Sequence, residues 1–321
     1  MGAKDGTGIP DVVNFAFGTD DVPLPVGEDM PVCRICGNES GSREYLAQER
    51  MFGTGEVFPY FQCARCECLQ IASIPEDISR HYSGGYYSLG GDPAKPSREN
   101  RLNMNAWLKR VHIGTSERVL DVGCGQGRIL HEFARAGFSS LTGIDPFIEK
   151  DIAYSNGIRI FKKDVEEMTG EFDLIMMNHS FEHMSNPTAT LKKIHQLLVP
   201  GKFLLIRIPL VSSFAWKKYS THWVSLDAPR HFYLHSLASM DLLARNTGFS
   251  IQEVLFDSTD FQFWGSEQYL RGIPLFAPNS YAVDRKASVF SWMQIKIFEA
   301  KAMLMNRRKL GDQACFFLRK D

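Results

Sequence analysis

The sequence shows no excess of charge of either sign and no long apolar run. Its 321 residues contain 36 Lys and Arg and 37 Asp and Glu, which gives a formal net charge of -1. Nucleic-acid-binding domains usually carry a basic excess, so we expect no nucleic-acid partner, although a local basic patch is still open. No stretch of about 18 apolar residues occurs, so we expect no membrane span. The N-terminus also lacks a basic segment followed by an apolar one, so we expect no signal peptide and a cytoplasmic location.

Most of the cysteines lie in one short part of the chain. The seven cysteines are Cys33, Cys36, Cys63, Cys66, Cys68, Cys124 and Cys315. Without an export signal, close cysteine pairs favour a metal over disulfides. Cys33 with Cys36, and Cys63 with Cys66, form two CxxC turns that together can complete a tetrahedron around Zn²⁺. Four protein ligands leave no open position, so we expect a structural zinc; Cys68 is the alternative fourth ligand, less favoured by its spacing.

Changes in composition along the sequence divide the chain into four parts. Residues 1–29 are rich in Gly, Pro and Asp and predict a poorly ordered tail. Residues 30–82 are the expected zinc-binding module, and residues 83–97 have the composition of a linker. Residues 98–321 are expected to form one large domain with an insertion over residues 262–310.

Strands and helices alternate in the large domain. The expected strands cover residues 118–122, 141–145, 158–161, 172–178, 202–209, 251–258 and 311–320. The expected helices cover residues 98–112, 128–138, 187–198 and 237–249. This alternation predicts an α/β fold with a parallel sheet covered by helices on both faces. The insertion contains a further helix, within residues 288–305, that is apolar nearly all round; we expect core burial, or else a substrate wall or dimer surface.

A glycine-rich loop follows the first strand of the large domain and opens a helix. It has the sequence VLDVGCGQG over residues 119–127. Glycine lets the backbone turn sharply and approach a ligand closely, because no side chain intervenes. Asp145 ends the next strand, where a carboxylate can accept both hydroxyl groups of a ribose. Asp164 follows the strand after that, where a contact to an adenine amine is expected.

This loop resembles the first motif of class I S-adenosylmethionine (SAM)-dependent methyltransferases, written hhDhGCGxG. The segments FDLIMMNHSFEHM and LVPGKFLLI resemble later motifs of the same family, in the same order. The resemblance covers about residues 98–321 and implies a Rossmann-like sheet of seven strands, the last of them antiparallel. A dinucleotide-binding loop would have its third glycine where Arg128 stands, so SAM is favoured over a dinucleotide.

The same resemblance implies which residues bind SAM. Gly123 and Gly125 are expected to pack against the methionine portion, and Asp121 to help hold its amino group. Asp145 is expected to bind the ribose and Asp164 to contact the adenine. The full expected set of cofactor-binding residues is Asp121, Gly123, Cys124, Gly125, Asp145, Asp164 and Asn178.

The cysteine module and the segment QIASIPEDISRHYSGGYYS resemble the head of bacterial methyltransferases in sugar and surface-polysaccharide pathways. The leading hypothesis is therefore methyl transfer to a hydroxyl or carbon of a sugar or sugar nucleotide, a small-molecule substrate. Methylation of rRNA or tRNA is an alternative, because some such enzymes carry a zinc module, but the missing basic excess and a missing Asn-Pro-Pro-Tyr motif argue against it. Quinone-type O-methylation and a non-catalytic SAM-binding protein also stay open, as does a homodimer.

Two histidine motifs offer a base for the acceptor's proton. His183 ends the motif NHSFEH at the carboxyl end of one strand, and His231 lies in a PRH motif after the next strand. A hydroxyl or carbon acceptor needs such a base, and both strand ends should open on the same cleft. Glu182 or Asp227 can orient an imidazole and stabilise its cation. Arg230 is expected to pair with a phosphate or carboxylate of a ligand, or with Asp227.

Overall fold

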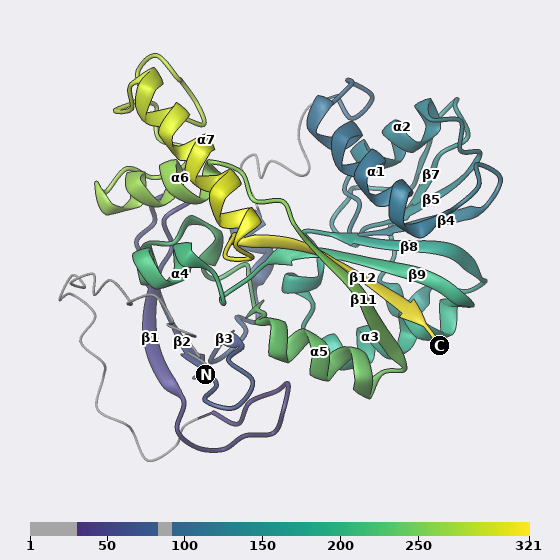
Figure 1. Cartoon of the computed structure of the whole chain (residues 1–321), viewed down its shortest axis with the longest axis horizontal. Coiled ribbons are helices and arrows are strands. Elements are labelled where there is room, and N and C mark those ends of the chain that lie inside the picture. Colours follow the sequence, from purple (N-terminus) through teal and green to yellow (C-terminus); the bar gives the residue numbers. More distant parts are fainter. Residues whose placement is uncertain (1–30, 83–91) are drawn as a thin grey trace, which may run out of the picture.

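The centre of the fold is an eight-stranded, mostly parallel sheet. The computed structural model describes residues 31–82 and 92–321, so the expected tail and most of the expected linker lie outside the described residues. The strand order is β11-β12-β9-β8-β4-β5-β7-β6 (Figure 1). These strands are β4 (Arg118–Val122), β5 (Ser140–Ile144), β6 (Ile152–Ala153), β7 (Arg159–Phe161), β8 (Phe172–Asn178), β9 (Leu198–Pro209), β11 (Phe249–Phe256) and β12 (Gln313–Lys320).

The pairing of the strands places a reversal of strand order at the middle of the sheet. β4 pairs in parallel with both β5 and β8, and β8 pairs in parallel with β9. β12 runs antiparallel between β9 and β11. The sheet differs from the predicted seven strands by β6, a two-residue strand antiparallel to β7. After β4, the next strands of the chain add to one side of it, and β8 then pairs on its other side. In α/β sheets, ligands bind at the carboxyl ends of the strands beside such a reversal of strand order.

Helices cover both faces of the sheet, as the alternation predicts. Figure 1 shows α1 (Arg98–Val111) and α2 (Arg128–Arg135) on one face, and α3 (Pro187–Leu197) and α5 (Leu237–Asn246) on the other. Strand β8 contributes side chains to the hydrophobic cores on both faces of the sheet, because successive side chains of a strand point to opposite faces. Its Leu174 and Met176 join the core that includes α1 and α2, whereas Ile175 and Met177 join the core that includes α3 and α5.

The N-terminal part of the chain folds into a smaller antiparallel sheet. We call residues 31–82 the head; it contains β1 (Arg43–Gln48), β2 (Val57–Gln62), β3 (Leu69–Ile71) and the short helix η1 (Ile78–Tyr82). The fourth strand of this sheet, β10 (Tyr233–Leu234), comes from the large domain and pairs antiparallel with β3. The head therefore shares its sheet with the large domain.

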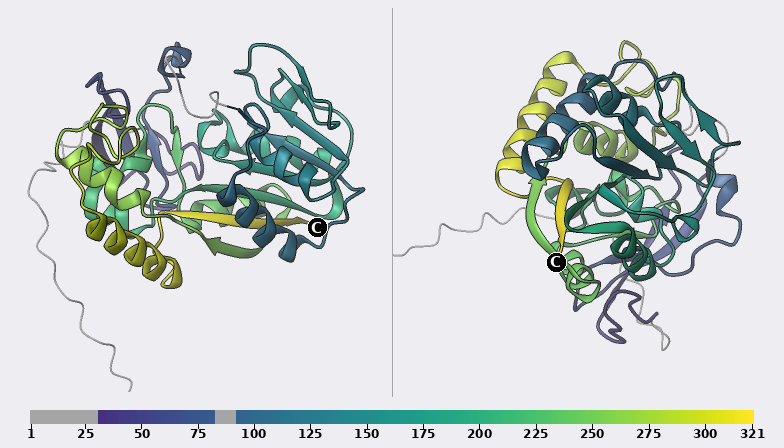
Figure 2. Two further views of the ribbon diagram at one scale, coloured as in Figure 1. Left: turned by 90° about the horizontal axis from the view of Figure 1, so that it is seen from above. Right: turned by 90° about the vertical axis from the view of Figure 1, so that its right-hand side faces the viewer.

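The remaining elements gather with the head at one end of the large sheet. They are η2 (Val165–Glu167), η3 (Phe181–His183), α4 (Phe214–Tyr219), η4 (Ser220–His222), η5 (Val224–Leu226), α6 (Phe261–Leu270) and α7 (Trp292–Arg307). Strand β9 ends at Pro209, which lies opposite Gln313 at the start of β12. Figures 1 and 2 show the head, α6 and α7 beyond this end. The carboxyl ends of the parallel strands thus face the head and the insertion.

Helix α7 differs from its predicted environment. Core burial was expected, yet only Ile295, Ala302 and Met305 of its 16 residues are buried. The large apolar residues on its other faces are exposed in the part of the chain that the structure describes. None of the helices in the described parts of the chain has the length and apolarity to cross a membrane.

Candidate active site

The glycine-rich loop lies at the reversal of strand order, between β4 and α2. Gly123 has a φ of +72° and its N–H donates to the carbonyl of Ile144, 2.8 Å away, at the end of β5. A Cβ on Gly123 would stand 2.4 Å from the Cβ of Ser180. The hydroxyl of Ser180 donates to the carbonyl of Val122 at 2.7 Å, which fixes that neighbour. Only glycine fits this position, because both the positive φ and the close approach exclude a side chain.

Two carboxylates face this loop, and neither forms an ion pair with a cationic side chain among the described residues. Asp145 accepts hydrogen bonds from the N–H groups of Gly125 (2.8 Å) and Phe147 (2.9 Å). Asp121 is buried, and burial together with the nearby Asp145 carboxylate raises the pKa of Asp121 to about 8. An ammonium group beside Asp121 would relieve this repulsion, and the second lone pairs of Asp145 can accept hydroxyl groups. The loop and the two acids therefore fit the amino group and ribose of SAM.

The other expected cofactor residues lie along the same edge with partners of their own. Asp164 is exposed and caps η2, accepting the N–H of Val165 at 2.6 Å. The side-chain oxygen of Asn178 accepts from Arg207 at 3.2 Å. The Cys124 thiol packs against β5, where a Cβ on Gly143 would stand 2.5 Å from its sulfur. Roles for these residues toward SAM stay predictions.

His183 and His231 lie together, as the sequence predicts. Their rings pack edge to face with centroids 4.8 Å apart. Nδ1 of His183 lies 2.8 Å from the carbonyl of Arg230, and Nδ1 of His231 lies 2.8 Å from the carbonyl of Ser225. A carbonyl only accepts, so each Nδ1 carries the proton and each Nε2 keeps its lone pair. Both imidazoles thus present Nε2 as the basic atom.

Glu182 is fully buried beside these rings. Its carboxylate lies 3.9 Å from Nε2 of His231 and 3.4 Å from Nδ1 of His179, and neither oxygen has a hydrogen-bond partner among the described residues. Burial alone raises the pKa of Glu182, but the surrounding imidazoles outweigh it and bring the pKa to about 2. Burial, and then His183, lower the pKa of His231 to about 4. At neutral pH Glu182 is therefore charged and His231 is a neutral base.

The head contributes Tyr82 to the same cluster. Its hydroxyl lies 3.0 Å from Nδ1 of His183, and its ring stacks on Phe147 with centroids 5.0 Å apart. Phe147 follows Asp145 by two residues and donates its N–H to Asp145, so Tyr82 bridges the segment after Asp145 and the histidine pair. The sequence did not predict Tyr82, since nothing in a local motif shows that η1 packs against η3 and the segment after β5.

Arg230 joins the head to the histidine loop and is fully buried. It forms ion pairs with Asp227 at 2.6 Å and with Glu49 of the head at 2.9 Å, and it donates to the carbonyl of His81 at 3.2 Å. The hydroxyl of Tyr60 donates to the carbonyl of His231 at 2.8 Å. Of the two expected partners, Asp227 is the one observed. The expected ligand phosphate or carboxylate has no access to this guanidinium, because two protein carboxylates surround it.

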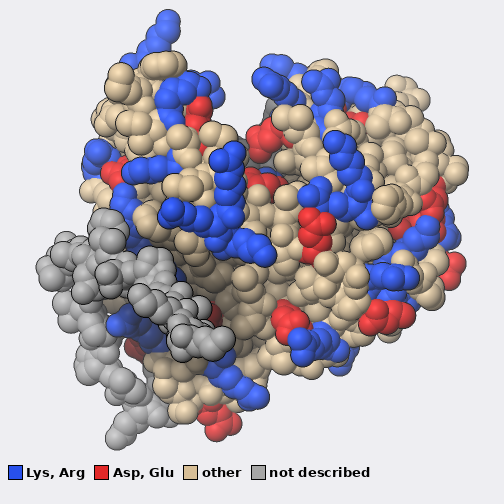
Figure 3. All heavy atoms as spheres, in the orientation of Figure 1, with Lys and Arg blue, Asp and Glu red and all other residues tan. Residues whose placement is uncertain are grey.

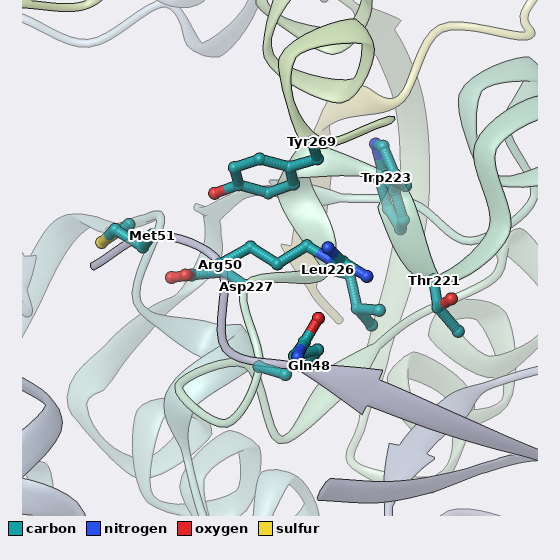
Figure 4. Close-up of a pocket in the computed structure, with 9 residues that line it drawn as sticks. Gln48, Arg50, Met51, Thr221, Trp223, Leu226, Asp227 and Tyr269 are labelled. Carbon is teal, nitrogen blue, oxygen red and sulfur yellow. The ribbon is translucent and has the colours of Figure 1, made fainter. Parts of the chain in front are cut away.

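A second arginine of the head, Arg50, lies in a small pocket that Asp227 also lines. The pocket is lined by Gln48, Arg50, Met51, Thr221, Trp223, Leu226, Asp227, Ala228 and Tyr269. Figure 4 shows the Arg50 side chain extended through it, between Tyr269 and Gln48. Nε of Arg50 is buried and has no hydrogen-bond partner among the described residues. Burial lowers the pKa of Arg50.

The four expected metal ligands form one cluster. The sulfur atoms of Cys33, Cys36, Cys63 and Cys66 all lie within 4.8 Å of one another. Sγ of Cys33 is 3.6 Å from Sγ of Cys66, and Sγ of Cys36 is 3.5 Å from Sγ of Cys63. A tetrahedral Zn²⁺ with Zn–S bonds of about 2.3 Å has sulfurs about 3.8 Å apart, close to these distances. Cys68 lies outside the cluster, 3.8 Å from Nδ1 of His235.

Comparisons with known proteins point to the same chemistry. Residues 97–254 match the family model described as "Methyltransferase domain". A ubiquinone biosynthesis O-methyltransferase of Pseudomonas aeruginosa (strain LESB58) is 30% identical over 113 residues, which are 32% of this chain and 48% of the relative. A protein of the same name from Xanthomonas oryzae pv. oryzae (strain PXO99A) is 28% identical over 182 residues, 50% of this chain and 74% of the relative.

The chain spans about half the length of the Pseudomonas relative. Among solved structures, the cyclopropane synthase MmaA2 from Mycobacterium tuberculosis is 16% identical and has a TM-score of 0.47, covering 75% of this chain and 95% of that one. The family match and the methyltransferase relatives support a SAM-dependent methyltransferase domain, with SAM as the methyl donor, and so confirm that prediction.

Proposed function

We propose that the whole chain is a SAM-dependent methyltransferase that acts on a hydroxyl group of a small molecule. The observation that carries this proposal is the meeting of two sets of residues at the reversal of strand order. The glycine loop with Asp121 and Asp145 fits SAM, and Tyr82 joins the segment after Asp145 to His183, which packs on the neutral His231. SAM supplies an electrophilic methyl group on its sulfonium.

The chain's own residues provide alignment and a base. Methyl transfer is an in-line displacement, so the acceptor oxygen must be held in line and kept from water. Nε2 of His183 or His231 takes the hydroxyl proton as the oxygen attacks. The charge of the buried Glu182 carboxylate, 3.9 Å from Nε2 of His231, stabilises the imidazolium that forms. Tyr82 and the carbonyls of Arg230 and Ser225 hold the rings in place.

A sugar or sugar nucleotide is the acceptor class we favour. The resemblance of the head supports it, and Arg50, whose Nε has no hydrogen-bond partner among the described residues, offers a cation for the anionic part of such a substrate. A quinone-type phenol is the second candidate, since the relatives with the quoted matches are named ubiquinone biosynthesis O-methyltransferases. Incubation with SAM and each acceptor class, followed by mass spectrometry, tests both: a methylated sugar nucleotide supports the first, and a methylated phenol alone contradicts it.

We also propose that the cysteine cluster holds one structural zinc ion. Four thiolates at tetrahedral spacing leave no position open for a substrate, so the metal would stabilise the head and take no part in the reaction. The side chain of Gln70 supports the cluster, donating to Sγ of Cys33 at 2.9 Å.

Asp145→Ala should weaken SAM binding by about 30-fold, because a carboxylate that accepts two hydroxyl groups contributes on the order of 2 kcal/mol. Isothermal calorimetry with SAM and with S-adenosylhomocysteine measures this at a single site. Asp241→Ala, on the exposed side of α5, is the matched control and should leave the affinity unchanged. Equal affinities in the wild type and in Asp145→Ala would refute the cofactor assignment.

Arg50→Met should abolish stabilisation by a nucleoside diphosphate, if Arg50 binds the anionic part of the acceptor. A charged hydrogen bond contributes about 1.5–3 kcal/mol, so the affinity should fall about tenfold or more. Thermal melting with added uridine diphosphate gives the measurement, and Arg43→Met on exposed β1 serves as the control. No stabilisation of the wild type, or equal stabilisation of both variants, would argue for an uncharged acceptor.

A further inference from the structure

Helix α7 has one face that packs on the protein. Ile295, Phe298, Ala302 and Met305 recur every three or four residues and join the cores beneath the helix. Side chains at this spacing lie on one side of an α-helix. The contacts of this face with α6 fix α7 on the surface, so its opposite face is presented outward.

The outward face of α7 carries a continuous apolar stripe. Met293, Ile297, Ala300 and Leu304 stand four, three and four residues apart, which places them in one row. Met293 is 67% exposed, Ile297 48% and Leu304 42%. Trp292 (73% exposed) lies at the start of the helix beside this row. Monomeric soluble proteins rarely leave such a row uncovered, so it marks a contact surface.

Basic side chains flank the stripe on both sides. By helical spacing Lys296 and Arg307 lie along one side and Lys301 and Arg308 along the other. Residues 283–310 contain seven Lys and Arg but only two acids, although the whole chain has a formal charge of -1. Figure 3, in the orientation of Figure 1, shows Lys and Arg gathered over α7. Glu299 pairs with Lys296 at 2.6 Å, whereas no ion pair of Lys301, Arg307 or Arg308 occurs among the described residues.

We propose that α7 docks flat on the surface of a membrane that contains anionic lipid. Its 16 residues span about 24 Å, too short to cross a bilayer but suited to lying in the headgroup region. The apolar stripe would enter the acyl boundary, Trp292 would sit at the interface, and the flanking cations would meet lipid phosphates. Each Lys or Arg near an anionic surface adds to the attraction, so the stripe and its borders act together.

The charges favour this occupant over a second copy of the chain. A row with spacing four, three, four also fits the seam of a helix pair. In such a pair Lys296, Lys301 and Arg308 would occupy the flanking positions that set partner choice, and like charges would face one another. A nucleic acid would satisfy the cations but leave the apolar row exposed to water. An anionic membrane satisfies both features.

Sedimentation of the full chain with vesicles tests the proposal. We expect binding to vesicles of phosphatidylcholine mixed with phosphatidylglycerol, weaker binding to phosphatidylcholine alone, and loss of binding at high salt. The double variant Ile297→Glu with Leu304→Glu should bind at least about tenfold more weakly, because two apolar anchors and the charge balance are lost. The emission of Trp292 should shift to shorter wavelength only when the wild type is bound.

Leu102→Glu on exposed α1 is the matched control, since it adds a charge in place of an equally exposed apolar side chain. SAM affinity and melting temperature, unchanged in every variant, show that the fold is intact. The proposal is overturned if the wild-type protein does not bind anionic vesicles. It is also overturned if the double variant binds them as well as the wild type does. A dimer that the double variant dissociates, or RNA binding that it abolishes without vesicle binding, assigns the stripe to another partner and equally overturns it.

Discussion

Cys33→Ser, or removal of the metal by a strong chelator, should unfold the head and abolish methyl transfer. Structural zinc in small modules contributes about 10–16 kcal/mol of apparent binding energy, which is also their folding energy. The large domain depends on the head, because Ser236 at the start of α5 donates to the carbonyl of Cys66 at 2.6 Å, and β10 pairs with β3. Loss of the metal should therefore reach the histidine loop as well.

Elemental analysis and hydrogen exchange provide the measurements. We expect about one zinc per chain in the wild type, none in Cys33→Ser, and rapid exchange of the amides in β1 to β3 once the metal is lost. Cys68→Ala is the matched control and should keep its zinc, since Cys68 stands outside the cluster. A folded head without metal, or with a disulfide between Cys33 and Cys36, would disprove the site. Two metal ions per chain would point to Glu182, His183 and His231, whose ligand atoms also lie within 4.8 Å of one another.

The parts of the molecule that the sequence predicts are those encoded by short, local patterns. The glycine loop, the acid at the end of β5 and the cap of α1 by Ser97 each depend on a few neighbouring residues. Strand β8 is apolar on both faces, which is typical of a strand in the middle of a parallel sheet. The two CxxC turns lie 26 residues apart in the chain, but they could be predicted to meet because a zinc ion needs four ligands and each turn supplies two.

The contacts that the sequence does not predict join distant segments. Arg230 meets Glu49 across 181 positions, and Tyr82 meets His183 across 101. Neither pairing leaves a local pattern, since each depends on how the head sits on the large domain. The exposure of α7 has a different cause: its composition is apolar all round, and composition alone does not show that one face has no neighbour among the described residues.

His231→Ala and His183→Ala should each lower turnover by about 10²-fold or more, as expected for a lost general base. SAM affinity should stay within about threefold, because the hydrogen bonds of the two rings go to Tyr82, Arg230 and Ser225, not to the glycine loop or its two acids. Steady-state kinetics with the identified acceptor, together with calorimetry, separates the two effects. Combining both changes should cost little more than one alone if the rings act as a unit.

The pH dependence identifies which ring takes the proton. A base must be neutral, and burial holds the pKa of His231 at about 4, so a rate that depends on His231 persists as pH falls from neutral and drops only as pH passes through about 4. Glu182→Gln removes the charge that stabilises the imidazolium, so turnover should fall while SAM affinity is unchanged. If turnover instead falls with decreasing pH at a pH well above 4, His231 is not the base. If, with S-adenosylhomocysteine bound, both Nε2 atoms lie more than about 8 Å from the position of the methyl group, neither ring reaches the proton, and alignment alone would have to carry the reaction.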